Sequence, residues 1–168
     1  MKHSPEDVPS FSCLYERYGR DVLGVLLRLT NGDRAEAEDL TQETFLAAFK
    51  GQKNFSGRVP FRAWLVGIAA RRWRDSRRRP KPATTPLTED PPSVVLMDRA
   101  ITDRVALVSA LGQLPDDQQT AVLLVLGQGL TYREAAEALG VPSGTLKWRV
   151  TEALRRLRPL LTDEGESQ

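Results

Sequence analysis

Two helices joined by a glycine turn are encoded between residues 130 and 161, and this pattern constrains the fold most. Thr131 and Glu134 have the T-x-x-E spacing of a capping box, which predicts that a short helix begins at YREAAEAL. Gly140 and the turn GVPSG then lead to a longer helix that begins near Ser143. The pair predicts a helix-turn-helix unit, whose second helix enters the major groove of DNA.

The second of these helices has one apolar and one basic face. Helical spacing predicts inward-facing Leu146, Val150, Ala153, Leu154, Leu157 and Leu161. Lysine and arginine donate to phosphates and guanine edges, so the opposite face predicts DNA contacts by Ser143, Thr145, Lys147, Trp148 and Arg149. An ordinary hairpin would carry mixed charges on that face, where Glu152 is the one acidic exception. Trp148 either contacts DNA or a partner there, or packs on a neighbouring helix.

The rest of the chain has the same helical periodicity. Apolar residues recur at helical spacing over 11–29, 34–50, 61–78 and 101–111, and again after Pro115. In the second of these helices Leu40, Phe45 and Phe49 are expected to be buried. No segment shows the alternation of a strand, so the sequence predicts an all-α fold.

A proline- and threonine-rich stretch divides these helices into two groups. Residues 80–99 show almost no periodicity, which is typical of an extended linker. We therefore expect two small helical domains, at 8–79 and 100–161. The charge also reverses across the linker, so a formal net charge of only +2 conceals a polarised molecule.

An arginine-rich segment, RRWRDSRRRPKP, closes the first domain. Part of this positive charge interacts favourably with the dipole at a helix C-terminus. Several guanidinium groups close together also predict a surface that binds phosphates, and a tryptophan among them suits strand-separated nucleic acid. Trp64 is expected in the core because it lies at helical spacing with Leu65 and Ile68, whereas Trp73 is expected to be exposed.

Composition excludes most other classes of protein. The 168 residues include one histidine and one cysteine, which rules out a histidine-based triad and a Cys/His zinc site. No phosphate-binding glycine motif and no membrane-spanning apolar run is present. We expect a cytoplasmic protein that is not an enzyme, has no cofactor and no metal, and does not insert into the membrane.

Three segments together resemble one family. AEAEDLTQETFLAAFK, the F-x-G at Phe55 and Gly57, and FRAWLVGIA resemble the second region of extracytoplasmic-function (ECF) sigma factors. The segment from Leu114 to Arg158 resembles their fourth region, and the linker lies where theirs does. The resemblance covers nearly the whole chain, in order.

The resemblance implies the function and the partners. Such proteins bind core RNA polymerase, direct it to promoter DNA, and are usually held inactive by an anti-sigma factor. Polymerase binding is implied for a helix with an acidic side, at Asp39, Leu40, Gln42, Glu43 and Phe45. Recognition and melting of the minus-ten element are implied for Arg58, Arg62, Arg71, Arg72, Trp73, Arg74, Arg77 and Arg78. The helix from Ser143 is implied to read the minus-thirty-five element.

The sequence departs from the family at three positions. Arginine stands at 71 where members often have asparagine, tryptophan at 148 where a small residue is common, and glycine at 67 where a bulky or basic residue is frequent. Two alternatives stay open: a helix-turn-helix regulator that binds duplex DNA by itself, and an interaction protein that has lost promoter function. The acidic helix favours the sigma factor, because a stand-alone regulator has no need of it.

Overall fold

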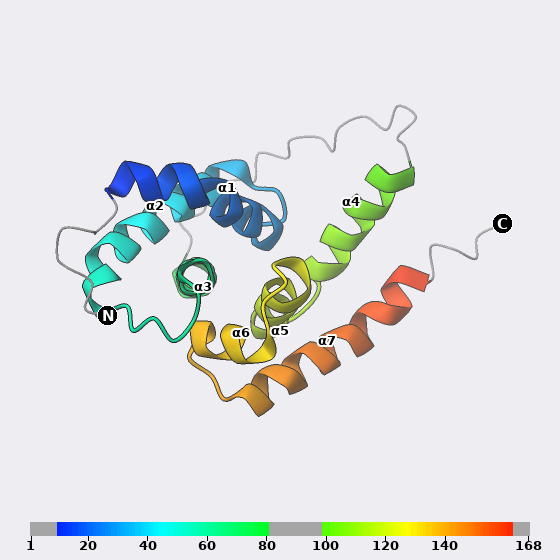
Figure 1. Cartoon of the computed structure of the whole chain (residues 1–168). Coiled ribbons are helices and arrows are strands. Elements are labelled where there is room, and N and C mark those ends of the chain that lie inside the picture. Colours follow the sequence, from blue (N-terminus) through cyan, green and yellow to red (C-terminus); the bar gives the residue numbers. More distant parts are fainter. Residues whose placement is uncertain (1–9, 81–98, 163–168) are drawn as a thin grey trace.

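The computed structural model describes residues 10–80 and 99–162, which form seven α-helices and two short helical turns (Figure 1). The first half contains α1 (Phe11–Leu29), α2 (Arg34–Gly51), the 3₁₀ turn η1 (Gln52–Asn54) and α3 (Phe61–Arg78). The second half contains α4 (Arg99–Gly112), α5 (Asp116–Val122), the π-helical turn η2 (Leu123–Gly127), α6 (Tyr132–Leu139) and α7 (Ser143–Thr162). The described ranges contain no strand, which confirms the all-α prediction. The expected linker falls almost wholly on residues outside them.

Local sequence accounts for where several helices begin and end. Asp33 caps α2, since its carboxylate accepts a hydrogen bond from the backbone N–H of Glu36 at 3.0 Å. The capping box of α6 is confirmed: Thr131 Oγ1 accepts from Glu134 N at 3.1 Å, and Glu134 Oε2 accepts from Thr131 N at 2.9 Å. Gly140 ends α6 in the left-handed conformation, with φ of 68°.

The first three helices pack against one another as a small bundle (Figure 1). Their buried side chains come from the faces that helical spacing predicted, and they include Val22, Val25, Leu26, Phe45 and Leu65. Burial of such apolar surface is the main force that holds the bundle together. The loop at 52–60 connects α2 to α3, so it lies at the start of the arginine-bearing helix.

In the second half, α7 lies along α4, α5 and α6. Four of the α7 residues predicted to face inward are buried: Leu146, Val150, Ala153 and Leu157. The prediction is wrong for Leu154 and Leu161, which are 44% and 45% exposed. Leu154 lies at the edge of this buried face, since Leu157 further along α7 is buried, whereas Leu161 lies one turn beyond Leu157, near the end of the helix.

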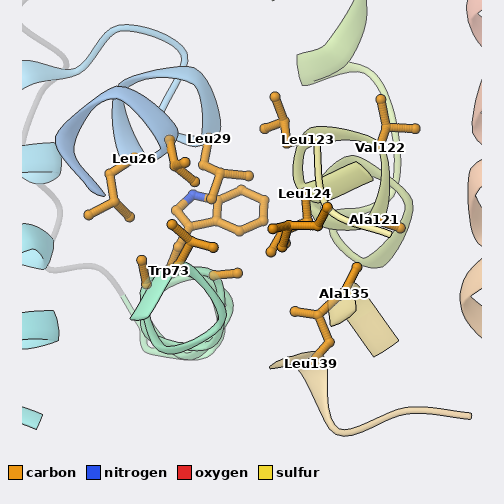
Figure 2. Close-up of a cluster of buried hydrophobic side chains, with 14 of the residues drawn as sticks. Leu26, Leu29, Trp73, Ala121, Val122, Leu123, Leu124, Ala135 and Leu139 are labelled. Atoms are coloured by element: carbon orange, nitrogen blue, oxygen red, sulfur yellow. The ribbon is translucent and has the colours of Figure 1, made fainter. Parts of the chain in front are cut away.

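The two halves share one apolar core. Helix α3 packs along α6, and a single cluster of buried side chains continues from α1–α3 into α5 and α6. Figure 2 shows Trp73 of α3 with Leu26 and Leu29 of α1 on one side and Leu124 on the other. In the described parts of the chain, no helix has both the length and the apolarity needed to cross a membrane.

Candidate nucleic-acid interface

Helix α3 and the loop before it carry seven arginines, on more than one side of the helix, which we call the arginine surface. Four of them, Arg58, Arg71, Arg77 and Arg78, are exposed, while Arg62, Arg72 and Arg74 are half-buried. The basic residues that the resemblance assigned to the minus-ten element thus lie on one helix and the loop before it, and their role there stays a prediction. Guanidinium groups so placed can meet several phosphates along one strand.

The two tryptophans of α3 differ in how well their expected places hold. Trp73 was expected to be exposed, and this prediction is wrong, because only 2% of its surface is accessible. Its face of α3 turns toward α1 and η2, and the large ring fills the space between the two halves (Figure 2). Trp64 is half-buried, with its ring centroid 5.1 Å from that of Phe55 and 5.2 Å from that of Phe61.

Two of the arginines donate hydrogen bonds to the second half of the chain. Arg62 donates from Nη1 to the backbone carbonyl of Gln128 at 3.1 Å and from Nη2 to the side-chain oxygen of Gln128. Its Nε also lies 2.9 Å from Asp21 Oδ2. Arg71 donates from Nη1 to the carbonyl oxygen of Ala138, on α6, at 3.1 Å. No local sequence pattern indicates these carbonyl acceptors, since they depend on tertiary packing.

Two further arginines form ion pairs with carboxylates of the second half. Arg77 Nε lies 3.2 Å from Asp116 Oδ1 at the start of α5, and its guanidinium lies 5.5 Å from the Trp73 ring centroid. Arg58 Nη1 lies 3.6 Å from Glu137 Oε1 on α6. The basic surface of one half thus faces acidic side chains and carbonyls of the other.

The arginines also act on one another electrostatically. The pKa of Arg71 is lowered by partial burial of its guanidinium against α6, although the residue as a whole is exposed, and by the positive charges of Arg74 and Arg72. Arg74 Nη1 is buried with no hydrogen-bond partner among the described residues. A phosphate at this surface would supply the missing acceptor and offset the mutual repulsion.

The predicted reader of duplex DNA lies on α7. Ser143, Thr145 and Lys147 are exposed, and Trp148 is 60% exposed, so it does not pack in the core. Arg149 is different: its side chain is largely buried, and its Nε lies 3.1 Å from Asp117 Oδ2 on α5. Arg149 therefore helps to anchor α7 to the helix on which it packs.

The residues assigned to polymerase binding divide into two groups on α2. Asp39 and Gln42 are exposed and Glu43 is half-buried, whereas Leu40 and Phe45 lie in the core. Leu40 and Phe45 thus support this face of α2 from beneath.

An exposed aromatic patch, formed by Phe11, Tyr15, Leu46 and Phe49, lies on α1 and α2. The ring of Phe11 contacts those of Tyr15, Phe45 and Phe49 at centroid distances of 6.1–6.3 Å. The expected burial of Phe49 is wrong, because 46% of its surface is accessible. Exposed patches of this kind mark sites where proteins bind one another. The sequence signal that could have identified this patch is that α1 and α2 have more apolar positions than one face of each helix can bury.

No group of three histidine, cysteine, aspartate or glutamate side chains in residues 10–80 and 99–162 has the arrangement of a metal site.

Comparison with known families places the chain beside bacterial transcription factors. The family model of Sigma-70 region 2 matches residues 14–82, and that of Sigma-70, region 4, matches residues 104–157. The ECF RNA polymerase sigma factor SigM of Mycobacterium tuberculosis is 33% identical over 95% of this chain and 81% of its own length. The RNA polymerase sigma-H factor of Pseudomonas aeruginosa is 28% identical over 94% of this chain and 91% of its own.

Two solved structures have a similar arrangement of helices. The sigma factor RpoE of Bartonella quintana, in complex with the anti-sigma factor NepR, has a TM-score of 0.68 and 24% identity, over 92% of this chain and 98% of that one. CnrH, in complex with the cytosolic domain of CnrY, has a TM-score of 0.65 and 28% identity, over 94% of this chain and 89% of that one.

Proposed function

This chain belongs to the ECF group of sigma-70 RNA polymerase sigma factors, and we propose that it is an alternative sigma factor that directs core RNA polymerase to specific promoters. The observation that carries the proposal is the presence of both sigma regions, in order, in one chain whose α3 and α7 carry basic surfaces. Sigma factors assist initiation without catalysing a reaction. We therefore assign the chain no catalytic residue, cofactor or metal, and we place it in the cytoplasm with polymerase and promoter DNA.

Polymerase binding is assigned to α2 and its neighbourhood. Asp39, Gln42 and Glu43 present acidic and polar groups, and the aromatic patch lies on the same two helices as additional apolar area. Protein interfaces combine such an apolar centre with a polar rim. Leu40 and Phe45 act here as buried supports.

Minus-ten recognition is assigned to the arginine surface. Its guanidinium groups would bind the phosphates of the melted strand, while the half-buried ring of Trp64 lies close to the loop at 52–60. Capture of unstacked bases offsets the free energy of unpairing. Trp73 joins this site only where the two halves separate, because its ring is buried between them.

Minus-thirty-five recognition is assigned to the exposed N-terminal half of α7. Ser143 and Thr145 lie at its N-terminus, where free backbone N–H groups favour a phosphate. Lys147 and Trp148 point to solvent and extend this surface. We also propose an anti-sigma factor as a partner, since the two similar solved structures are complexes with a protein partner.

In vitro transcription with core polymerase on a library of random promoter fragments tests this function. We expect transcripts that depend on the chain and begin downstream of a shared two-part sequence. Asp39→Arg with Gln42→Ala should abolish both transcription and co-elution with core polymerase, because it reverses charge on the proposed docking helix. Glu16→Arg, a charge reversal at an exposed position of α1, is the matched control.

The other outcomes separate the alternatives. Polymerase binding without any chain-dependent transcript would indicate an interaction protein that has lost promoter function. Duplex binding by the free chain, with neither transcription nor co-elution, would indicate a stand-alone helix-turn-helix regulator.

A further inference from the structure

Trp148 stands at the centre of the outward face of α7. Leu146 and Val150 have 0% and 1% of their surface accessible, so they define the inward side of this helix. Residue 148 lies midway between them in the sequence, and at 3.6 residues per turn its side chain leaves the helix about 180° from the middle of the buried side. The exposed fraction of Trp148, 60%, agrees with that direction.

The rotation of α7 about its own axis is fixed where the ring stands. Arg149, next to Trp148, has only 17% of its side chain exposed, and its Nε lies 3.1 Å from Asp117 Oδ2 on α5. Leu146 and Val150 are buried beside it, so the helix cannot turn the indole into the core without breaking these contacts. The fold therefore holds the ring outward, as a side chain that binds a ligand requires.

The surface around the ring is open and polar. A Cβ atom added to Gly144, one turn before Trp148, would meet no atom within 4 Å, and Thr145 beside it is exposed. Glu152, one turn after the ring, accepts a hydrogen bond from Arg155 Nη2 at 2.6 Å. A single apolar ring among polar neighbours lacks the contiguous apolar area that protein interfaces bury at their centre. These surroundings favour nucleic acid over a protein as the ligand of the ring.

Indole has two features that a base edge can match, a large apolar ring and one N–H donor. In the major groove thymine presents an acceptor, O4, beside an apolar C5-methyl group. Guanine presents two acceptors without a methyl group, adenine combines an acceptor with an amino donor, and cytosine presents an amino donor. Thymine is thus the one base whose edge suits both features of the indole.

We propose that Trp148 makes this chain select thymine at one position of the duplex element that α7 binds. The proposal rests on the function proposed above and names a base that this helix reads. The apolar body of the ring packs on the C5-methyl group, while the indole N–H donates to O4. The bulk of the ring, at the centre of a groove about 12 Å wide, also keeps the helix axis away from the base edges. Shorter side chains such as Ser143 and Thr145 therefore contact phosphates instead.

Transcription by core polymerase with the full chain, on the library of random promoter fragments, tests the base preference. Base frequencies upstream of the transcripts are compared between wild type and Trp148→Ser, which removes a ring that the core does not need. We expect one upstream position at which wild type prefers thymine by about tenfold and Trp148→Ser shows no preference. Leu126→Ser is the matched control, because it removes a side chain that is 57% exposed outside α7, and it should keep the preference.

Deoxyuridine separates the methyl contact from the rest of the base, because it keeps O4 and lacks only the C5-methyl group. At the selected position of a promoter fragment, this exchange should weaken binding of the wild-type holoenzyme about fourfold, since burial of one such group contributes about that factor. It should leave binding of the Trp148→Ser holoenzyme unchanged. Trp148→Phe keeps an apolar ring without the N–H donor, so it should stay sensitive to deoxyuridine while its overall preference for thymine weakens.

Other results contradict the proposal in different ways. Identical base frequencies for wild type and Trp148→Ser would mean that the ring does not read DNA. A lost preference for another base, or a wild-type holoenzyme that is insensitive to deoxyuridine, would refute the thymine contact. Loss of co-elution with core polymerase in Trp148→Ser would show that the ring binds a protein. All of these results leave the proposed sigma function intact, whereas a wild-type chain that supports no transcript overturns that function and the thymine contact together.

Discussion

At the scale of single residues, Trp73 holds the most consequential position. Its ring contacts α1 on one side and the segment around Leu124 on the other, and it is among the largest fully buried side chains. The arginines on either side of Trp73 in the sequence had favoured the prediction that its ring is exposed. Tertiary packing instead makes it the centre of the shared core, since a buried tryptophan contributes more apolar area than any other side chain available there.

Truncation of this ring should be among the most destabilising single changes in the chain. We expect Trp73→Ala to lower the free energy of unfolding by about 3–5 kcal/mol, because it removes apolar contact and leaves a cavity. Urea unfolding followed by circular dichroism measures the loss. Trp148→Ala, at an exposed ring, is the control and should cost less than about 0.5 kcal/mol. Equal losses in the two variants would contradict the central role of Trp73.

Glu152 is the acidic exception on the outer face of α7, where two arginines of the same helix donate hydrogen bonds to its carboxylate. Hydrogen bonds from Arg155 and then Arg156 lower its pKa from 4.5 to about 2. The corresponding distances are 2.6 Å from Arg155 Nη2 and 3.2 Å from Arg156 Nε, both to Oε1. Glu152 therefore neutralises part of the basic face of α7 at physiological pH.

The pH dependence follows from the direction of this shift. Because the folded pKa lies below the unfolded value, the stabilisation is fully present above about pH 4.5 and is lost as the pH falls toward 2. An NMR titration of the Glu152 carboxyl should give a midpoint near 2. In Arg155→Ala the midpoint should move up toward 4.5, whereas Arg133→Ala on α6 should leave it unchanged. An unmoved midpoint in Arg155→Ala would refute the assigned cause.

At the scale of elements, the sequence predicted most boundaries well, because caps and helical periodicity are local signals. Asp33, the Thr131–Glu134 capping box and Gly140 all act within one turn of chain, so no tertiary information was needed. The failures are Phe49, Leu154 and Leu161, where a helix has more apolar positions than its neighbours cover. Periodicity identifies the apolar face of a helix, but it does not say how far the packing partner extends.

Helix α7 combines an anchoring residue with contact residues. Lys147 is exposed, whereas Arg149 pairs with Asp117 of α5. If Lys147 neutralises one promoter phosphate, Lys147→Ala should weaken holoenzyme binding to a promoter fragment and reduce the log–log salt slope by about 0.9. Arg149→Ala should also lower the thermal stability of the free chain, which Lys147→Ala should not.

The control for these variants is Arg20→Ala, at an exposed cation of α1 in the other half. It should keep the wild-type salt slope. Binding curves for Lys147→Ala that coincide with those of wild type at every salt concentration would show that this face of α7 does not read the promoter.

At the scale of the whole molecule, the arrangement of the two halves could not be predicted from the sequence. The composition of residues 80–99 predicted a linker, and the division into domains stays a prediction. That one core runs through both halves depends on contacts such as Gly67 with Ala138 and Arg62 with Gln128, which join positions about 70 residues apart. The resemblance identified Gly67 and Arg71 as departures from the family, but the sequence does not show which residues they contact.

A shared core has a consequence for how the molecule unfolds. Since Trp73 is buried by side chains from both halves, any separation of the halves would expose its ring even where the helices persist. In wild type we expect the Trp73 fluorescence of a Trp64→Phe, Trp148→Phe chain to change at the same urea concentration as the helical circular dichroism, because the halves unfold as one unit. Adding Gly67→Ala should move the fluorescence transition to a lower urea concentration, because the added methyl group cannot fit against Ala138. The helical transition should then occur at a higher urea concentration than the fluorescence transition. Gly24→Ala should keep the two transitions together. Two separate transitions already present in the parent chain would show that the halves are only loosely joined and do not unfold as one unit.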